Sequence, residues 1–370
     1  AFAKTRAFHI LVLLAGLAFL FTGAFHGNVW FDESYSVAIA NHSFAGIWDI
    51  GSGDVHPVLF YWGLHVLNLL FGQNILAYRL FTVAGTFSLA LLGLLVVRRD
   101  FGWRIGVLFS FLVLFMPYIA FMAVEIRMYS WASFTVAGCF LFAWRIACAL
   151  AGAGEAESGR AKKDGVWWSR MWHVHDIEGL PKWAGAPRRW WLAFFAFSLA
   201  SAYLHYYGVL AAFLANLGLL AFIAMRKRSA LVPFLIGAVV QVALYAPWLA
   251  VVANQVGVVS GSYWADVEFP RTLVEWAFYP IATSQVIFAD TYGWQWVIAL
   301  GACAAVAIVS AAGGIYAAWQ RGAFQHDAHS SSSIRKRVSA WVVSPEVLPA
   351  LCGVALYVGV FAIALMALAR

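Results

Sequence analysis

The sequence predicts an all-α polytopic membrane protein, in which a bundle of transmembrane helices carries interfacial helices in its first extracytoplasmic loop. Hydrophobic residues make up 63% of the 370 residues, charged residues only 11%, and the mean hydropathy is +0.79. Apolar runs of about twenty residues recur along the chain, and each is long enough to cross the hydrocarbon core as a helix. Together these observations exclude a soluble globular protein.

Residues 1–370 are predicted to form a single transmembrane domain. The first apolar run follows Lys4 and Arg6, as in a secretory signal, but it is long and no small-residue cleavage site precedes Asp32. We therefore interpret it as a retained span. The predicted spans are residues 7–25, 77–97, 105–123, 129–149, 190–204, 206–225, 231–252, 294–318 and 347–369.

The topology depends on whether residues 57–71 also cross the membrane. Fifteen residues reach only about 22 Å as a helix, which is short of the roughly 30 Å hydrocarbon thickness. If this segment does not cross, the 24 Lys and Arg residues lie on the cytoplasmic side, apart from Arg79, Arg127, Arg271 and Arg370. The positive-inside rule then holds, and we predict a multi-pass protein of the inner (plasma) membrane with one extracytoplasmic loop over 26–76.

That loop is predicted to lie on the membrane surface. Apolar residues recur at three- and four-residue spacing through Tyr35–Ile39 and again through Phe44–Trp48, which is typical of interfacial helices. Residues 253–293 form a second outer loop, and 151–189 and 319–346 form cytoplasmic loops. In the first of these cytoplasmic loops, His173-Val174-His175-Asp176 could be a metal-ligand set, but its tryptophan-rich surroundings favour a solvated or interfacial loop.

Asp32 and Glu33 follow the first span directly. Asp is a favoured N-cap and Glu is common in a first helical turn, so a structural role is open. Alternatively, the two carboxylates face the same aqueous region as Asp54 and His56, where they are suited to deprotonating a hydroxyl or binding a metal. An ordinary turn explains the glycines and the proline around Asp54, but not the addition of His56 at a spacing that points both side chains the same way.

Glu125 and Arg127 end the third predicted span at its outer face. They are either interfacial charges that reach water or, together with Arg79, part of a site for an anionic lipid phosphate. Residues 190–225 run between two basic, cytoplasmic ends, so they must go out and return. Their turn, His205-Tyr206-Tyr207-Gly208, is predicted to place an imidazole and two phenols beside the acidic loop.

An ordered pattern of motifs runs through the chain. Its members are Asp32-Glu33-x-Tyr35, Asp54-x-His56-Pro57, Arg79-Leu80, Arg98-Arg99-x-Phe101-Gly102, Glu125-x-Arg127-Met128-Tyr129, His205-Tyr206-Tyr207-Gly208 and Tyr245-x-Pro247-Trp248. Over about residues 8–265, this pattern resembles the GT-C glycosyltransferases of the protein O-mannosyltransferase and lipid A aminoarabinose-transferase type. The chain departs from that family in having Pro57-Val58 where a double proline is usual.

The resemblance implies a GT-C-like helix bundle that transfers a sugar, with inversion, from a polyprenyl-phosphate donor to an extracytoplasmic acceptor such as a cell-envelope glycan, lipid or protein. By analogy, Asp32 is the catalytic base, Glu33 a neighbouring acceptor or metal contact, and Arg127 a donor-phosphate contact. A divalent metal at the acidic outer loop stays open, and nucleic acid is not expected as a partner. The remaining expected substrate-binding residues are Asp54, His56, Arg79, Glu125, Tyr129, His205, Tyr206 and Tyr207.

The alternative is a polytopic transporter or lipid flippase that uses Glu125, Arg127 and His205 along its path. Transporters usually show repeat symmetry and discontinuous helices near the midplane, and neither is evident in the sequence. The clustering of acidic residues in an outer loop therefore favours the enzyme.

Overall fold

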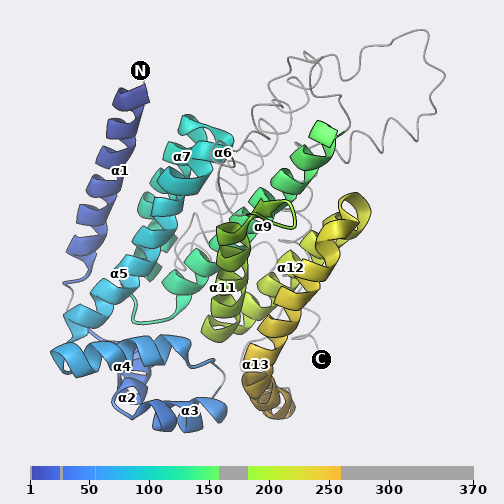
Figure 1. Cartoon of the computed structure of the whole chain (residues 1–370). Coiled ribbons are helices and arrows are strands. Elements are labelled where there is room, and N and C mark those ends of the chain that lie inside the picture. Colours follow the sequence, from blue (N-terminus) through green and yellow to red (C-terminus); the bar gives the residue numbers. More distant parts are fainter. Residues whose placement is uncertain (1, 26–27, 55, 158–181, 260–370) are drawn as a thin grey trace, which may run out of the picture. The chain divides into compact units, whose positions relative to one another are not determined.

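The computed structural model describes residues 2–25, 28–54, 56–157 and 182–259, and these residues are almost entirely helical (Figure 1). Within them, five helices are long and apolar enough to cross a membrane. The predicted all-α membrane class is thereby confirmed. The spans at 294–318 and 347–369, the loop at 319–346, the His173–Asp176 motif and most of the loops at 151–189 and 253–293 lie outside the described residues.

The five long helices coincide with predicted spans. They are α1 (Phe2–Gly23), α5 (Ile75–Leu92) with its continuation, α9 (Tyr129–Glu157), α12 (Tyr206–Arg226) and α13 (Leu231–Val259). Large apolar side chains cover the outside of α1 and α13, as a lipid-facing surface requires, whereas buried polar side chains such as His9 and Ser110 find partners inside. The helices α9 and α13 extend beyond the predicted ends at 149 and 252.

The third predicted span, 105–123, is wrong as a continuous helix. The chain forms α7 (Trp103–Phe115) and a separate α8 (Pro117–Ala123), with the extended residue Met116 between them. Pro117 has no N–H to donate and disfavours a helical conformation in the residue before it, so the helix must end there. The short α8 then leads into a non-helical link over residues 124–128.

At the other end of α5, the helix widens into a π-helical turn (Gly93–Val97) and ends in α6 (Arg98–Phe101). Gly93 lies so close to α7 that a Cβ atom on it would come within 2.1 Å of the Ser110 hydroxyl. In α6, Asp100 accepts two hydrogen bonds from Arg145 of α9, at 2.8 and 2.9 Å, and both side chains are buried. This bidentate pair satisfies two charges that lipid would not solvate.

The second half of the described chain begins with a small hairpin, β1 (Lys182–Trp183) and β2 (Ala186–Pro187), whose turn uses positive φ angles at Ala184 and Gly185. The helix α11 (Arg188–Leu204) follows, and a single extended residue, His205, separates it from α12. The predicted turn is therefore present. A 3-10 turn, η3 (Arg228–Ala230), connects α12 to α13.

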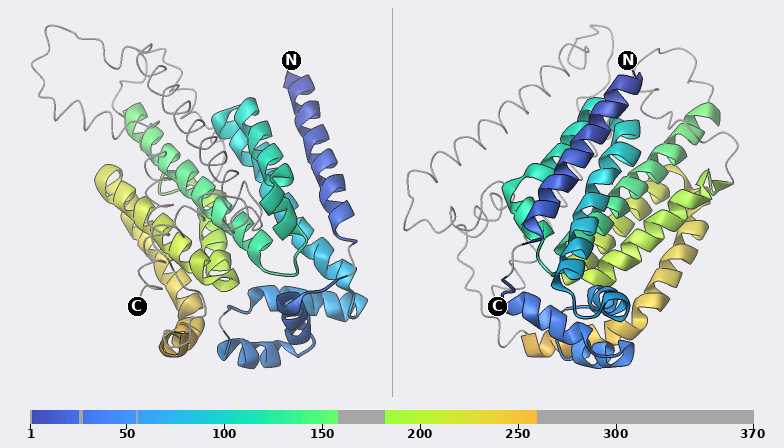
Figure 2. Two further views of the ribbon diagram at one scale, coloured as in Figure 1. Left: turned by 180° about the vertical axis from the view of Figure 1, so that it is seen from behind. Right: turned by 90° about the vertical axis from the view of Figure 1, so that its left-hand side faces the viewer.

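Three short helices lie across one end of the bundle: α2 (Phe31–Ala40), α3 (Phe44–Ser52) and α4 (Leu59–Phe71) (Figures 1 and 2). Their inner faces bury Ile39, Ile47 and Leu64 in one apolar cluster. The 13 residues of α4 reach roughly 20 Å, too short to cross a bilayer. Its length agrees with the prediction that residues 57–71 stay on one side.

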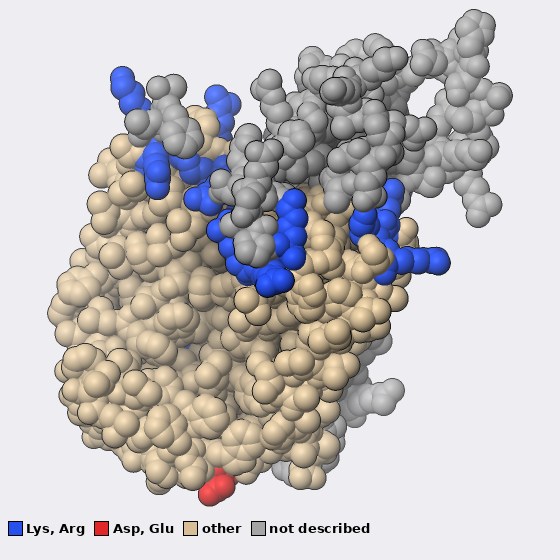
Figure 3. All heavy atoms as spheres, viewed as in Figure 1, with Lys and Arg blue, Asp and Glu red and all other residues tan. Residues whose placement is uncertain are grey.

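The exposed basic side chains of the described residues gather at the opposite end of the bundle (Figure 3). Lys and Arg there belong to the start of α1, the α6–α7 turn, the start of α11 and the α12–η3 turn. This asymmetry is the one that the positive-inside rule requires for a single orientation of the bundle.

A labelling experiment tests the position of α4. We expect single cysteines at Gly53 and Gln73, in a background without the four native cysteines, to react with a membrane-impermeant thiol reagent from the same side. Gln73 is the better position because its neighbour Gly72 has a φ of 65°, which side chains disfavour. Labelling of the two positions from opposite sides would show that α4 crosses the membrane.

Candidate functional site

Glu33 is almost fully buried at the start of α2, and its carboxylate contacts the residue before α2, the 124–128 link and α5. Its carboxylate accepts the backbone N–H of Trp30 at 3.2 Å and that of Ile126, in the 124–128 link, at 2.9 Å. The Arg79 guanidinium of α5 lies 3.6 Å from the same carboxylate. A further N–H of Arg79 bonds the carbonyl of Asn28 at 2.7 Å. These contacts give Glu33 a structural function whatever chemistry occurs nearby.

The residue before α2 is Trp30, so the interpretation of Asp32 as a helix N-cap is wrong. Asp32 lies one position before Glu33 in the first turn, and its side chain is 37% exposed whereas that of Glu33 is 2% exposed. The two adjacent carboxylates therefore experience different environments. Asp32 is open to solvent and to ligands, while Glu33 is held in the protein.

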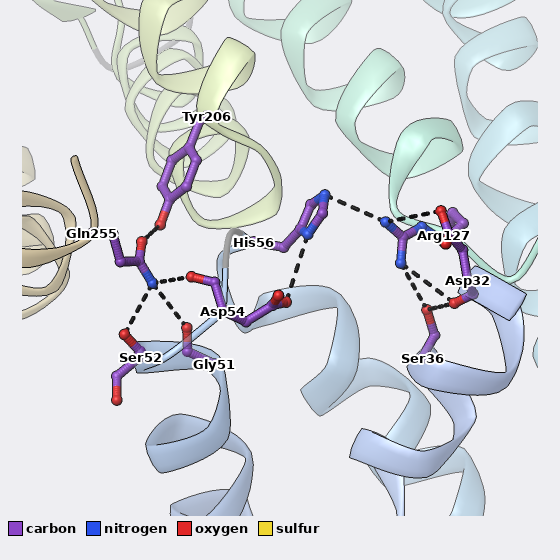
Figure 4. A network of polar contacts seen from close by, with 9 residues as sticks. All are labelled: Asp32, Ser36, Gly51, Ser52, Asp54, His56, Arg127, Tyr206 and Gln255. Atoms are coloured by element: carbon purple, nitrogen blue, oxygen red, sulfur yellow. Dashed lines mark hydrogen bonds and ion pairs between the residues drawn. The ribbon is translucent and has the colours of Figure 1, made fainter. Parts of the chain in front are cut away.

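Arg127 comes from the non-helical 124–128 link, not from a helix end as predicted. Its guanidinium is 4% exposed and lies 3.8 Å from the Asp32 carboxylate. It donates to the Asp32 carbonyl and to the Ser36 hydroxyl, both at 3.4 Å, and to His56 Nε2 at 3.3 Å (Figure 4). Its Nε has no hydrogen-bond partner among the described residues.

The expected juxtaposition of Asp54 and His56 is present, with 3.6 Å between the carboxylate and Nδ1. Because His56 Nε2 faces the Arg127 donor, the imidazole accepts there and carries its proton on Nδ1, toward Asp54. Asp54, His56, Arg127 and Asp32 thus form one continuous network (Figure 4). Tyr35 also interacts with Asp54, and burial together with that carboxylate raises the pKa of Tyr35.

The His205 turn borders this network with aromatic rings. The His205 ring lies 5.9 Å from that of His56 and 6.0 Å from that of Tyr129, and it stacks on Tyr207 at 5.3 Å. Burial lowers the pKa of His205 to about 4, with His56 and Arg127 adding to the effect. The imidazole is therefore neutral at pH 7, and its Nδ1 accepts the Tyr207 N–H. Tyr207 itself is 43% exposed.

Tyr206 contacts the loop over residues 26–76, here called the acidic loop, through Gln255 of α13. The sequence analysis did not single out Gln255. The Tyr206 hydroxyl donates to the Gln255 side-chain oxygen, and the Gln255 amide donates to backbone carbonyls of the loop (Figure 4). Ser36 was missed in the same way. Neither residue type carries a distinctive sequence signal, since Gln and Ser are common in structural hydrogen bonds.

Glu125 is buried, and its Oε2 has no hydrogen-bond partner within the described part of the chain. Burial raises the pKa of this carboxyl to about 7, and the nearby Glu33 reinforces the effect against the opposing charge of Arg127. Glu125 is therefore partly protonated at neutral pH, unlike an ordinary interfacial carboxylate.

Within the described part of the chain, the acidic residues do not converge on a metal site. No group of three or more His, Cys, Asp or Glu side chains in the described ranges is arranged to hold an ion. The oxygens of Glu33 are already bound by backbone N–H groups and Arg79. The donor set does not fit the divalent metal that the outer loop left open, so we derive no chemistry through one.

In comparisons with known proteins, no family model, curated protein or solved structure matches this chain.

Removal of the Glu33 carboxylate tests its structural function. We expect Glu33→Ala to lower the free energy of unfolding by roughly 3–5 kcal/mol, because it leaves the buried Arg79 charge uncompensated. Thermal unfolding in lipid or mild detergent measures the change. Asp49→Ala, at an exposed position of α3, is the control, and equal melting temperatures for the two variants would contradict the assignment.

Because the pKa of Glu125 is raised, we expect the stability of the folded protein to depend on pH. Its pKa is higher in the folded protein than the ordinary 4.5, so the folded state binds more protons between about pH 4.5 and 7 and loses stability as pH rises through that window. Glu125→Gln is neutral at every pH, so its melting temperature should fall less than that of the wild type from pH 5 to pH 8. Asp49→Asn should keep the wild-type fall. A fall in Glu125→Gln as large as in the wild type would show that this carboxyl ionises normally.

Proposed function

We propose that this protein is an inverting glycosyltransferase, which takes a sugar from a polyprenyl-phosphate donor and passes it to an acceptor hydroxyl on the extracytoplasmic face of the membrane. The observation that carries the proposal is the buried guanidinium of Arg127 beside the partly exposed carboxylate of Asp32. One network thus contains a cation for a phosphate and a base for a hydroxyl. These are the two groups that such a transfer needs most.

The guanidinium has unused capacity for an anion. Its hydrogen bonds measure 3.3–3.4 Å, its ion pair with Asp32 measures 3.8 Å, and its Nε is unpartnered among the described residues. Charge-assisted hydrogen bonds to an ideal partner are typically about 2.7–2.9 Å long. A phosphate oxygen would satisfy donors that the protein itself satisfies poorly, so the donor phosphate is a suitable ligand.

Asp32 is suited to the base. As the acceptor oxygen attacks the anomeric carbon, Asp32 takes the hydroxyl proton. The bond from that carbon to the phosphate oxygen breaks, and polyprenyl phosphate leaves with the electron pair. Attack from the face opposite the phosphate inverts the configuration. Because the lipid phosphate is already a good leaving group, the base is the critical partner and Arg127 stabilises the departing charge.

The end of the bundle that carries Arg127 also exposes apolar side chains, which suit a lipid-linked donor. Phe31 at the start of α2 is 80% exposed, and Leu69, Leu70 and Phe71 at the end of α4 are each more than 60% exposed. Large exposed apolar patches mark membrane or ligand contacts. Apolar side chains at the same end of the bundle as Arg127 would let a polyprenyl chain stay in the bilayer while its phosphate reaches the guanidinium.

We assign positioning functions to Glu33 and Arg79. Sequence analysis gave Glu33 a catalytic or metal-binding part and Arg79 a phosphate contact. Both side chains are at most 2% exposed and bind each other and the backbone. Glu33 and Arg79 therefore support the segment that carries Asp32 and the link that carries Arg127. In this proposal they do not contact the substrates, which bind to Asp32, Arg127 and the other residues of the network.

Substitution of Asp32 tests the base. Asp32→Asn keeps the shape of the side chain, so we expect donor binding and melting temperature close to wild type and a turnover that falls by about 10²–10⁴-fold, the usual contribution of general base catalysis. Turnover is measured as polyprenyl phosphate released from a polyprenyl-phosphate sugar. Asp49→Asn, an exposed Asp of the same loop, should remain active. An active Asp32→Asn enzyme would contradict the assignment.

Substitution of Arg127 tests the phosphate contact. We expect Arg127→Ala to weaken donor affinity or rate by roughly ten- to a hundredfold, since it removes a charge-assisted interaction of about 1.5–3 kcal/mol. Arg127→Lys should recover only part, because the planar fork of donors is lost. Arg104→Ala, at the opposite end of the bundle, is the control. Unchanged donor kinetics in Arg127→Ala would make this arginine a structural residue only.

A further inference from the structure

Gln255 joins the last described helix to the acidic loop more than 200 residues earlier in the chain. The side chain is 7% exposed. Its amide nitrogen donates to the carbonyls of Gly51 and Ser52, each at 3.1 Å, and to the carbonyl of Asp54 (Figure 4). Its oxygen accepts the hydroxyl of Tyr206 at the start of α12. One buried amide therefore connects α13, α12 and the end of α3.

The chemistry of this contact requires an amide. The carbonyls at the C-terminus of a helix lack intrahelical partners and carry negative partial charge. Gly51 and Ser52 are the last residues of α3, so an N–H₂ group is a suitable cap for them, whereas a carboxylate would place charge against three carbonyl oxygens. The backbone carbonyls fix the orientation of the amide, because they can accept only from its nitrogen, and the Tyr206 hydroxyl then donates to its oxygen.

An apolar contact accompanies the polar one. Trp248 lies seven residues before Gln255, hence on the same face of α13, and is fully buried. Its ring meets that of Trp48 in α3 at 5.0 Å, edge to face. A Cβ atom on Gly51 would lie 3.6 Å from Trp248 and only 2.5 Å from Val58. The end of α3 is therefore closely packed against α13, and Gln255 supplies the hydrogen bonds of that contact.

We propose that Gln255 is a positioning residue that holds residues 51–54, the end of α3 and Asp54, so that His56 meets Arg127. The proposal rests on the glycosyltransferase function above, for which it explains how the loop is kept in place. Among the described residues between α3 and α4, namely 53, 54 and 56–58, none belongs to a helix or strand. The backbone N–H groups of Gly53 and Asp54 bond back to α3, and the two N–H donors of Gln255, shared among three carbonyls, join this stretch to α13.

The experiment measures the loop position directly and separately from activity. In the full-length, cysteine-free protein, a cysteine at the fully buried Val58, whose side chain lies against Gly51, reports how readily this packing opens to a water-soluble maleimide. We expect Gln255→Ala to increase the labelling rate by at least about tenfold. Each net hydrogen bond contributes a factor of roughly two to ten, and the substitution removes more than one. Gln255→Glu should increase it further. Asn254→Ala, which removes the exposed amide next along α13, should leave the rate unchanged, and Tyr206→Phe should give a smaller increase.

Turnover provides the second readout. Gln255→Ala should lower turnover about tenfold or more in the wild-type background, and by less than about twofold in a His56→Ala background, since coupled residues are non-additive. A merely structural residue would lower the melting temperature and give the same loss in both backgrounds. If Gln255→Ala fails to fold, Tyr206→Phe serves for both measurements.

The two proposals fail in distinguishable ways. Unchanged labelling of the cysteine at Val58 in Gln255→Ala and Tyr206→Phe would overturn the positioning proposal, even if Asp32→Asn abolishes transfer. Equal losses of turnover in the two backgrounds would also overturn it. Faster labelling in a protein that cleaves no polyprenyl-phosphate sugar would leave Gln255 as the residue that holds the loop and remove the glycosyltransferase function.

Discussion

The end of the helix bundle that carries α2, α3 and α4 depends on one buried carboxylate. Glu33 accepts a backbone N–H from its own helix turn and another from the 124–128 link, and it faces the Arg79 guanidinium of α5. A buried charge is costly unless it is paired and hydrogen-bonded, and a membrane protein has little water with which to compensate it. This requirement brings together a loop helix, a transmembrane helix and an irregular link that are far apart in the chain.

The position of Arg127 follows from that arrangement. Because Ile126 is bonded to Glu33, the next residue is held beside α2, where its guanidinium meets Asp32 and Ser36. Asp32 and Glu33 then differ in environment although they are adjacent: the Asp32 side chain is 37% exposed, whereas that of Glu33 is buried and already bound. Gln255 acts from the opposite side of the network, on the segment that carries His56. A buried carboxylate, Glu33, and a buried amide, Gln255, thus contact the segments that carry the charged network.

Much of the fold could be predicted from the sequence, because apolar run length and charge asymmetry are direct consequences of the bilayer. The short helix at residues 59–71 and the tight turn at His205 belong to that part. The break at Pro117 was missed although the proline itself was a signal, since an apolar run was given more weight than the lost hydrogen bond. For the same reason, the sequence analysis did not predict the non-helical link over residues 124–128.

The site was predicted in part. The sequence pattern named Asp32, Asp54, His56 and Arg127, which the structure joins in one network, but it could not separate the functions of Asp32 and Glu33, because adjacent residues differ only in the partners that tertiary structure supplies. Gln255 could not be found at all, since its partners are backbone carbonyls from a distant segment and leave no trace in residue type.

The central claim is that the charges at this end of the bundle break the bond between a sugar and a lipid phosphate. The most direct measurement gives the purified protein, in liposomes, a polyprenyl-phosphate sugar labelled in both its lipid and its sugar, together with a hydroxyl acceptor. The account predicts that free polyprenyl phosphate accumulates in step with sugar bound to the acceptor. Movement of the intact donor across the bilayer without cleavage would contradict it and would favour a transporter or flippase.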